Sequence, residues 1–166
     1  MPRGFTLLEL VITIIIIAIL LMTAVPNFSR LLEQQNIKRF AGDLEGFLIQ
    51  AKSESVLQNK SLKIIYIKES DHWILSLNPE GNSPKTISEA KSSSITYLHS
   101  TNYPHLFLFS KVPSLTFNPV RATPHMPASF FFYKDQNKKL KLSIHHMTGR
   151  IRLCAQGGNH YGYKIC

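Results

Sequence analysis

Residues 5–25 read FTLLELVITIIIIAILLMTAV, an apolar run of 21 residues in which Glu9 is the one charged side chain. At ~1.5 Å of rise per residue, a helix of this length is ~30 Å long, which matches the hydrocarbon thickness of a bilayer. A carboxylate inside lipid is costly unless a partner neutralises it, so Glu9 is a candidate functional residue. The run therefore predicts a membrane-spanning helix.

The residues that follow this run narrow its interpretation. A secretory signal peptide ends in a small-residue cleavage site, and Met22-Thr23-Ala24 matches that pattern poorly. Pro26 closes the run at a point where a helix is expected to kink or locally melt. On these observations alone, a plain membrane anchor remains the simplest alternative.

The string Gly4-Phe5-Thr6-Leu7-Leu8-Glu9 resembles the processing site of type IV pilins and pseudopilins, and the resemblance covers about residues 1–60. It implies that residues 1–4 are a leader, that a prepilin peptidase cuts after Gly4, and that Phe5 becomes the methylated N-terminus. It also implies that Glu9 pairs with the N-terminal amine of a neighbouring subunit during filament assembly. Pro26 falls where that family carries its helix-breaking proline.

The segment 27–59 has the three- and four-residue spacing of an amphipathic helix. Its apolar stripe consists of Ile37, Phe40, Leu44, Phe47, Leu48 and Ala51. We therefore expect one long helix whose first part, residues 5–26, lies in the membrane or filament core and whose second part, residues 27–59, packs against a sheet.

Residues 60–166 change to a period of two and are rich in β-formers, which predicts a β-rich globular part. The expected strands are residues 61–67, 73–77, 95–98, 106–110, 115–117 and 130–133, with irregular loops at 78–94 and 118–129. Trp73 and the run Phe130-Phe131-Phe132 are expected to fill the core. The predicted fold class is α+β, with the long helix packed on an antiparallel β-sheet.

The formal net charge of +9, from 19 Lys+Arg against 10 Asp+Glu, belongs wholly to the second half of the chain. Residues 90–166 hold 10 basic side chains and a single acid, Asp135. Such asymmetry indicates a polyanion or membrane partner, although a solvated basic face explains it equally well. With one acid and no Gly-rich phosphate loop in this half, an enzyme is the least favoured class.

The basic residues concentrate in a predicted hairpin at residues 138–153. Leu140, Leu142 and Ile144 alternate with Lys139, Lys141 and Ser143, and Thr148-Gly149 offers a turn. Arg150 and Arg152 then alternate with Ile151 and Leu153. If the aliphatic side chains face the core, then Lys139, Lys141, Arg150 and Arg152 converge on the solvent face.

A cluster of lysines and arginines suits phosphate oxygens, and phosphate contacts supply most sequence-independent DNA affinity. Candidate helpers are Lys134, Lys138, Lys164 and Arg121. The rings of Tyr161 and Tyr163 could stack on exposed bases, although aromatic residues at such positions more often pack within a loop. The hairpin alone favours a solvated face over DNA binding.

Gly149-Arg150-Ile151-Arg152 looks like the GRxR motif near the C-terminus of FimT-type minor pilins, within the wider GspH/FimT family, and residues 44–55 are also similar to that family. The resemblance implies a minor pilin that binds double-stranded DNA without sequence preference for uptake in natural transformation. It implies a single-pass protein of the bacterial inner membrane with a periplasmic C-terminal part, assembled with other pilin subunits into a pilus at the cell surface. The alternative is a minor pilin, or a GspH-like type II secretion pseudopilin, that primes filament assembly and uses the basic face as a subunit interface.

Cys154 and Cys166 bracket a Gly-rich segment. In an oxidising periplasm two cysteines are expected to pair, and a loop of this size adds ~3 kcal/mol of stability in the chain-entropy model. The bond would hold Lys164 near the basic face. A metal site with His160 fits no standard spacing, so we expect neither a metal nor a cofactor.

Overall fold

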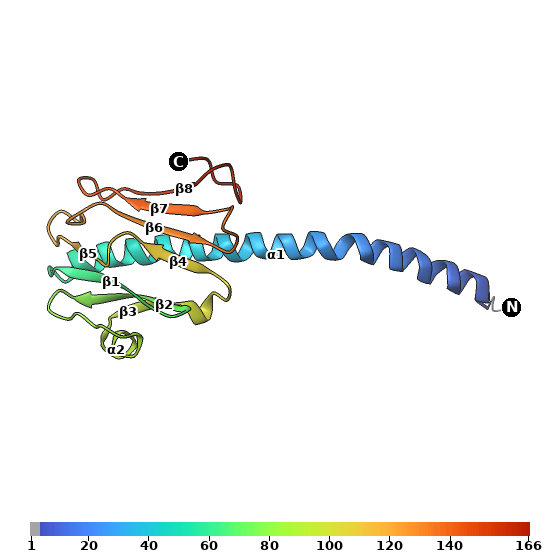
Figure 1. Cartoon of the computed structure of the whole chain (residues 1–166), viewed down its shortest axis with the longest axis horizontal. Helices are drawn as coiled ribbons and strands as arrows, with labels where there is room; N and C mark the ends of the chain where they lie inside the picture. The colour runs from blue at the N-terminus through green and yellow to red at the C-terminus, as the bar shows by residue number, and fades with distance from the viewer. Residues whose placement is uncertain (1–3) are drawn as a thin grey trace. The chain divides into compact units, whose positions relative to one another are not determined.

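The structure is a computed structural model that describes the backbone of residues 4–166 and, within that range, all side chains except those of residues 23–27 and 30. Over this range the chain forms a long helix, a short helix, a 3₁₀ turn and eight strands (Figure 1). The predicted α+β class, a long N-terminal helix followed by antiparallel β-structure, is confirmed.

Helix α1 (Leu7–Leu57) is the long helix predicted from the sequence. Thr6 caps it, because its Oγ1 accepts a hydrogen bond of 3.2 Å from the backbone N–H of Glu9. The helix continues through position 26, so the local melting expected at Pro26 is not found. The chain divides into two compact units, one ending at Asn36 and the other comprising Ile37–Cys166, and α1 contributes to both.

The first unit exposes its apolar side chains. Every side chain from Leu7 to Met22 is exposed, with fractions among the large apolar residues from 43% at Val11 to 83% at Leu7. Within the part of the chain that the structure describes, no helical stretch is both long and apolar enough to cross a bilayer. The membrane span at residues 5–26 stays a prediction.

The strands of the second unit form two antiparallel four-stranded sheets, where the sequence predicted one. The first sheet has the order β3 (Thr96–His99), β2 (His72–Pro79), β1 (Leu62–Glu69), β5 (Ser114–Phe117). The second has the order β4 (Phe107–Ser110), β6 (Ala128–Tyr133), β7 (Leu140–Ile144), β8 (Ile151–Ala155). The difference arises because β5 returns to pair with β1, while β4 pairs with β6, and neither long-range choice leaves a signal in local periodicity.

A second correction concerns the loop expected at residues 78–94. It contains helix α2 (Ile87–Ser93), capped by Thr86, whose hydroxyl accepts a 3.2 Å hydrogen bond from the backbone N–H of Glu89. Ile87 and Ala90 are buried against Ile74 of β2. The Thr-x-x-Glu spacing is a capping-box signal, and it predicts a helix start that the many Ser and Pro residues nearby obscure. A 3₁₀ turn, η1 (Ser100–Asn102), follows β3.

The part of α1 that belongs to the second unit packs against both sheets, from Ile37 to Ala51, and Figure 1 shows the sheets gathered along it. The predicted stripe is confirmed, since all six of its residues are buried. Phe40 joins the sheets, because its ring makes edge contacts with Trp73 of β2 at 5.5 Å and with Phe132 of β6 at 5.0 Å between centroids. Phe130 and Phe132 face this core as predicted, whereas Phe131 points to the opposite face of its sheet.

Candidate nucleic-acid interface

The β7–β8 hairpin has the register that the apolar pattern predicted. Leu142 lies opposite Leu153 and Ile144 opposite Ile151, with Leu142 and Ile144 fully buried. Side chains directly opposite each other share a face of the sheet, so the pair Ser143 and Arg152 is turned outward. Arg152 and Arg150 are both exposed.

The turn between these strands is closed by backbone hydrogen bonds from His145 N–H to Arg150 O (3.0 Å) and from Gly149 N–H to His145 O (2.8 Å). Gly149 has φ of +62°, a conformation that L side chains rarely adopt. A Cβ at this position would lie 2.9 Å from the carbonyl oxygen of Ala122 and 3.1 Å from Nζ of Lys52. Gly149 is buried, so of the predicted DNA-binding residues it does not face the surface, whereas the adjacent Arg150 is exposed.

The outward side chains of the second sheet form rows across its strands. Phe109 of β4 lies opposite Phe131 of β6, which lies opposite Lys141 of β7. In the next row, Arg152 of β8 lies opposite Ser143 of β7, which lies opposite Ser129 of β6. At the other end of this row, the backbone N–H of Lys111 donates a hydrogen bond to the carbonyl oxygen of Ser129. The segments that supply this face are far apart in the sequence, and the two sides of it differ: aromatic on β4 and β6, basic on β7 and β8.

Four basic residues follow one another obliquely across this face, and we call them the basic strip: Arg150, Arg152, Lys141 and Lys139. Alternate residues of a strand are ~6.7 Å apart, so the three steps of the strip cover ~20 Å. The ammonium of Lys139 lies 5.2 Å from the ring centre of Tyr133, and that of Lys141 lies 5.9 Å from the ring centre of Phe131.

Arg150 and Arg152 line a shallow depression of about 510 Å³ at the turn end of the sheet. Its other lining residues are Pro127, Ala128, Ser129, Ser143, Ile144, His145 and Thr148. None of these carries a carboxylate, and among the described residues neither arginine lies within ion-pair distance of an acid. Two guanidinium groups thus border a depression with no fixed negative charge to neutralise them, which favours an anionic ligand.

The other predicted basic residues are placed differently. Lys138 forms an exposed ion pair of 3.9 Å with Asp135, the one acid of this half of the chain. Lys134 is half-buried just after β6. Arg121 is exposed in the β5–β6 loop and lines a separate depression of about 480 Å³ with His146 and Glu80.

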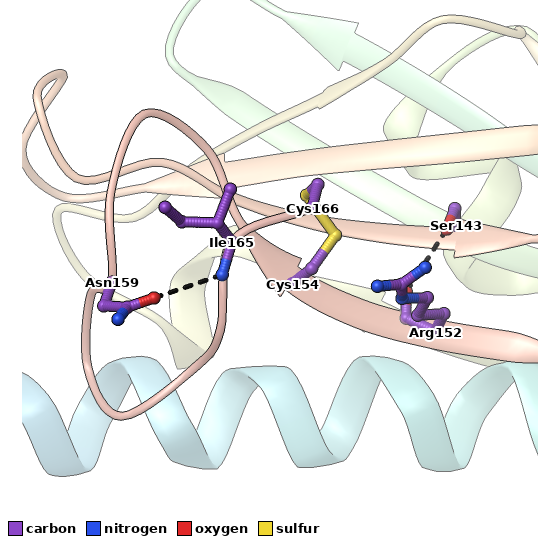
Figure 2. The surroundings of a disulfide bond; sticks show 6 residues. All are labelled: Ser143, Arg152, Cys154, Asn159, Ile165 and Cys166. Carbon is purple, nitrogen blue, oxygen red and sulfur yellow. Dashed lines mark hydrogen bonds between the residues drawn. A yellow bond between two sulfur atoms is a disulfide. The ribbon is translucent and has the colours of Figure 1, made fainter.

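The predicted disulfide between Cys154 and Cys166 is present, with 5.0 Å between the Cα atoms (Figure 2). Figure 2 shows it tying the end of the chain to β8, two residues beyond Arg152. The backbone N–H of Ala155 donates to Lys164 O at 2.8 Å and that of Cys166 to Ala155 O at 3.0 Å. The exposed Lys164 is therefore held beside β8, the strand that carries Arg152.

Tyr161 and Tyr163 do not offer free rings for stacking. Both are half-buried and pack against the core formed with α1. Burial, assisted by the nearby Glu45 carboxylate, raises the pKa of Tyr163 above its usual value. The loop packing that the sequence favoured for these two tyrosines is thus observed, whereas Phe107 and Phe109 of β4 have exposed rings.

The second predicted site lies at the start of the chain, and residues 1–3 of the leader lie outside the described residues. Gly4 and Phe5 precede α1, and Phe5 is 77% exposed. Glu9 lies exposed in the first turn of α1, where the helix dipole stabilises a carboxylate. Across the described residues no group of three His, Cys, Asp or Glu side chains is placed to hold a metal ion.

Comparison with known proteins bears on both regions. Residues 2–25 match the family model of the prokaryotic N-terminal methylation motif. The type IV minor pilin FimU of Pseudomonas aeruginosa (strain PAO1) has a similar structure, with a TM-score of 0.58, 22% sequence identity, and coverage of 75% of this chain and 96% of that chain. No curated protein sequence gave a significant match. The chain therefore has a type IV pilin-like fold and carries the methylation motif at residues 2–25.

Proposed function

We propose that this chain is a minor type IV pilin that binds double-stranded DNA, largely without sequence preference, for DNA uptake in natural transformation. The observation that carries the proposal is the pair of exposed arginines, Arg150 and Arg152, on a face that displays no acid among the described residues. Lys139 and Lys141 extend the positive charge across the same face, and Lys164 lies beside β8.

The geometry of the basic strip suits the DNA backbone. Its length of ~20 Å corresponds to ~6 base pairs of duplex, at 3.4 Å per base pair. Contacts to phosphates position a protein on DNA but read no bases, so binding through this strip is expected to be independent of sequence. Like charges crowded on one sheet face destabilise it slightly, and an anionic ligand offsets that cost.

The N-terminal region is the part of the chain through which we expect it to enter the membrane and then the pilus. The exposed apolar side chains of residues 7–22 need lipid or other apolar helices to cover them. We propose that a prepilin peptidase cuts after Gly4, that Phe5 is methylated, and that the helix resides in the inner membrane until assembly. Glu9 then pairs with the N-terminal amine of a neighbouring pilin subunit, and the globular part is displayed from the periplasm to the cell surface.

A second candidate function is a minor pilin or pseudopilin that primes filament assembly, with the basic face as a subunit interface. The structural similarity to the type IV minor pilin FimU favours this candidate. In that case Arg150 and Arg152 would meet carboxylates of another subunit rather than phosphates.

One set of variants distinguishes the two candidate functions, DNA binding and a subunit interface. Purified full-length chain in a non-ionic detergent is titrated against a duplex of about 20 base pairs in two unrelated sequences. Under the DNA proposal the double variant Arg150→Ala/Arg152→Ala loses most of the affinity for both duplexes. The variant Lys85→Ala/Lys91→Ala, which removes two exposed charges near α2, is the matched control and binds nearly as well as the parent.

The opposite outcome is equally clear. If the arginine variant binds DNA like the parent but no longer co-purifies with pilus subunits, the interface candidate replaces the DNA proposal.

A further inference from the structure

Four aromatic rings lie on the outer face of the second sheet, and we call them the aromatic cluster: Phe107, Phe109, Phe131 and Tyr133. Phe107 and Tyr133 stack across the strands at 5.5 Å between ring centroids and 23° between ring planes, and Phe109 lies 6.3 Å from Phe131. Phe107 is 47% exposed and Phe109 is 54% exposed. The two rings of β4 thus cover Tyr133 and Phe131 and still leave about half of their own surface open to a ligand.

Three lysines surround the cluster. Nζ of Lys111 and of Lys141 lie 5.5 Å and 5.9 Å from the centroid of Phe131, and Nζ of Lys139 lies 5.2 Å from that of Tyr133. Asp135, the one acid of residues 90–166, is engaged by Lys138. The face thus combines exposed π surfaces with unneutralised positive charge.

This combination narrows the class of ligand. An apolar protein surface would bury three ammonium groups without a partner, which is costly. Duplex DNA satisfies the lysines but keeps its bases stacked inside, out of reach of the rings. A single nucleic-acid strand presents both phosphates and unstacked bases, and proteins bind such strands with aromatic residues interleaved with basic ones on a sheet face.

We propose that the aromatic cluster, with Lys111, Lys139 and Lys141, binds single-stranded DNA by stacking unpaired bases on Phe107 and Phe109. The inference deepens the proposed function, on which it rests for the class of ligand. The strand runs over the same outer face that carries Arg152 and Arg150, so a duplex end with an unpaired overhang engages the arginines through its phosphates and the rings through its bases.

The test compares single-stranded and duplex DNA on the full-length chain in a non-ionic detergent. The probe is an oligonucleotide of about 12 residues that contains 2-aminopurine, whose fluorescence is quenched when it stacks on an aromatic ring. The expected result is quenching with the parent protein. Phe107→Ala/Phe109→Ala should weaken single-strand binding at least about fivefold and leave duplex affinity within about twofold, because each stacked base contributes at least that factor.

Two further variants keep the result interpretable. Phe107→Leu/Phe109→Leu keeps apolar side chains that cover Phe131 but removes the rings, so it too should lose the quenching. Tyr97→Ala removes a 42% exposed aromatic side chain from β3 in the other sheet and should change nothing. A melting temperature for each variant separates loss of binding from loss of fold.

The inference is overturned if the parent gives no quenching, or if the leucine variant binds single strands as the parent does. Failure of the proposed duplex function has a different signature: Arg150→Ala/Arg152→Ala would then leave duplex affinity intact whatever the phenylalanine variants do.

Discussion

At the scale of single residues, Gly149 has the most demanding position in the basic hairpin. Its positive φ places Arg150 at the start of β8, and its carbonyl accepts a 3.4 Å hydrogen bond from Lys52 of α1. The carbonyl oxygen of Ala122, in the β5–β6 loop, and Nζ of Lys52 would both lie within about 3 Å of a Cβ at this position. The backbone at position 149 therefore leaves no room for a side chain between the helix and that loop.

Gly149→Ala should accordingly weaken DNA binding without changing the charge. A left-handed backbone costs a non-glycine residue ~1–2 kcal/mol, and the contact with Ala122 O adds to that cost. The free energy of unfolding, measured in urea, should fall by at least that amount, and affinity for duplex DNA should fall with it. Gly81→Ala, where an added Cβ meets no atom within 4 Å and φ is not positive, is the control and should change neither quantity.

Tyr103 ties the helix to the segment that precedes β4. Its hydroxyl donates to Asp43 Oδ2 at 2.8 Å. Burial, together with the Asp43 carboxylate, raises the pKa of Tyr103 from its ordinary value of 10.0 to about 12. The protonated phenol is thus favoured in the folded state more than in the unfolded state.

This shift predicts a loss of stability in alkali. The contribution of Tyr103 is complete below pH ~10 and disappears as the pH rises through the folded-state value of about 12. Urea unfolding followed from neutral pH to above pH ~10 should show a steeper decline for the parent than for Tyr103→Phe. Equal slopes for the two proteins would contradict this account.

At the scale of elements, the β7–β8 hairpin was predictable because alternation is a local property. Leu140, Leu142 and Ile144 had to share a face, and the register of the partner strand followed from Ile151 and Leu153. The division into two sheets was not predictable in this way, because it depends on the pairing of β5 with β1 across a long stretch of chain.

Part of the candidate site could not be predicted from the sequence, for the same reason. Phe109 and Phe131 are 22 positions apart in the chain, and only the β4–β6 pairing places them opposite each other on the outer face. The run Phe130-Phe131-Phe132 indicates core, but alternation within a strand always sends the middle residue to the other side. The Thr86 and Glu89 capping signal of α2 was present but weak beside its Ser- and Pro-rich surroundings.

The disulfide is expected to stabilise the hairpin without forming the site. It closes a loop with a sequence separation of 12 between Cys154 and Cys166, for which the chain-entropy model gives ~3 kcal/mol. Cys154→Ser/Cys166→Ser should lower the free energy of unfolding by about that amount. Its affinity for duplex DNA in the cold should stay close to that of the parent, since the strand register holds Arg152. Loss of DNA binding by a folded double-serine variant would assign the bond a direct role.

At the scale of the whole molecule, charge and hydrophobicity are separated along the chain. Among the described residues, half of the exposed large apolar side chains lie within residues 5–22, and the excess positive charge belongs to residues 90–166. A subunit that inserts one end into a membrane or filament and displays the other to an anionic ligand requires this separation.

A substitution of Glu9 tests whether the N-terminal part of the chain takes part in filament assembly as proposed. A lone carboxylate is costly in lipid, so Glu9→Ala should insert into the membrane at least as well as the parent. It should enter pili poorly, because the neighbouring N-terminal amine loses its counter-charge. The ratio of pilus-associated to membrane-bound protein measures the effect, with Thr13→Ala on the same helix as the control. Normal incorporation of Glu9→Ala would refute the pairing.

If the basic strip binds DNA through phosphates, the affinity for duplex DNA must fall steeply as the salt concentration rises. Each neutralised phosphate contributes about −0.9 to the slope of log K against log salt, so four basic residues predict a slope of about −3.6. We expect that Arg150→Ala/Arg152→Ala lowers the affinity for duplex DNA and reduces the slope to about −1.8. Parallel lines with the parent's slope and affinity would contradict it.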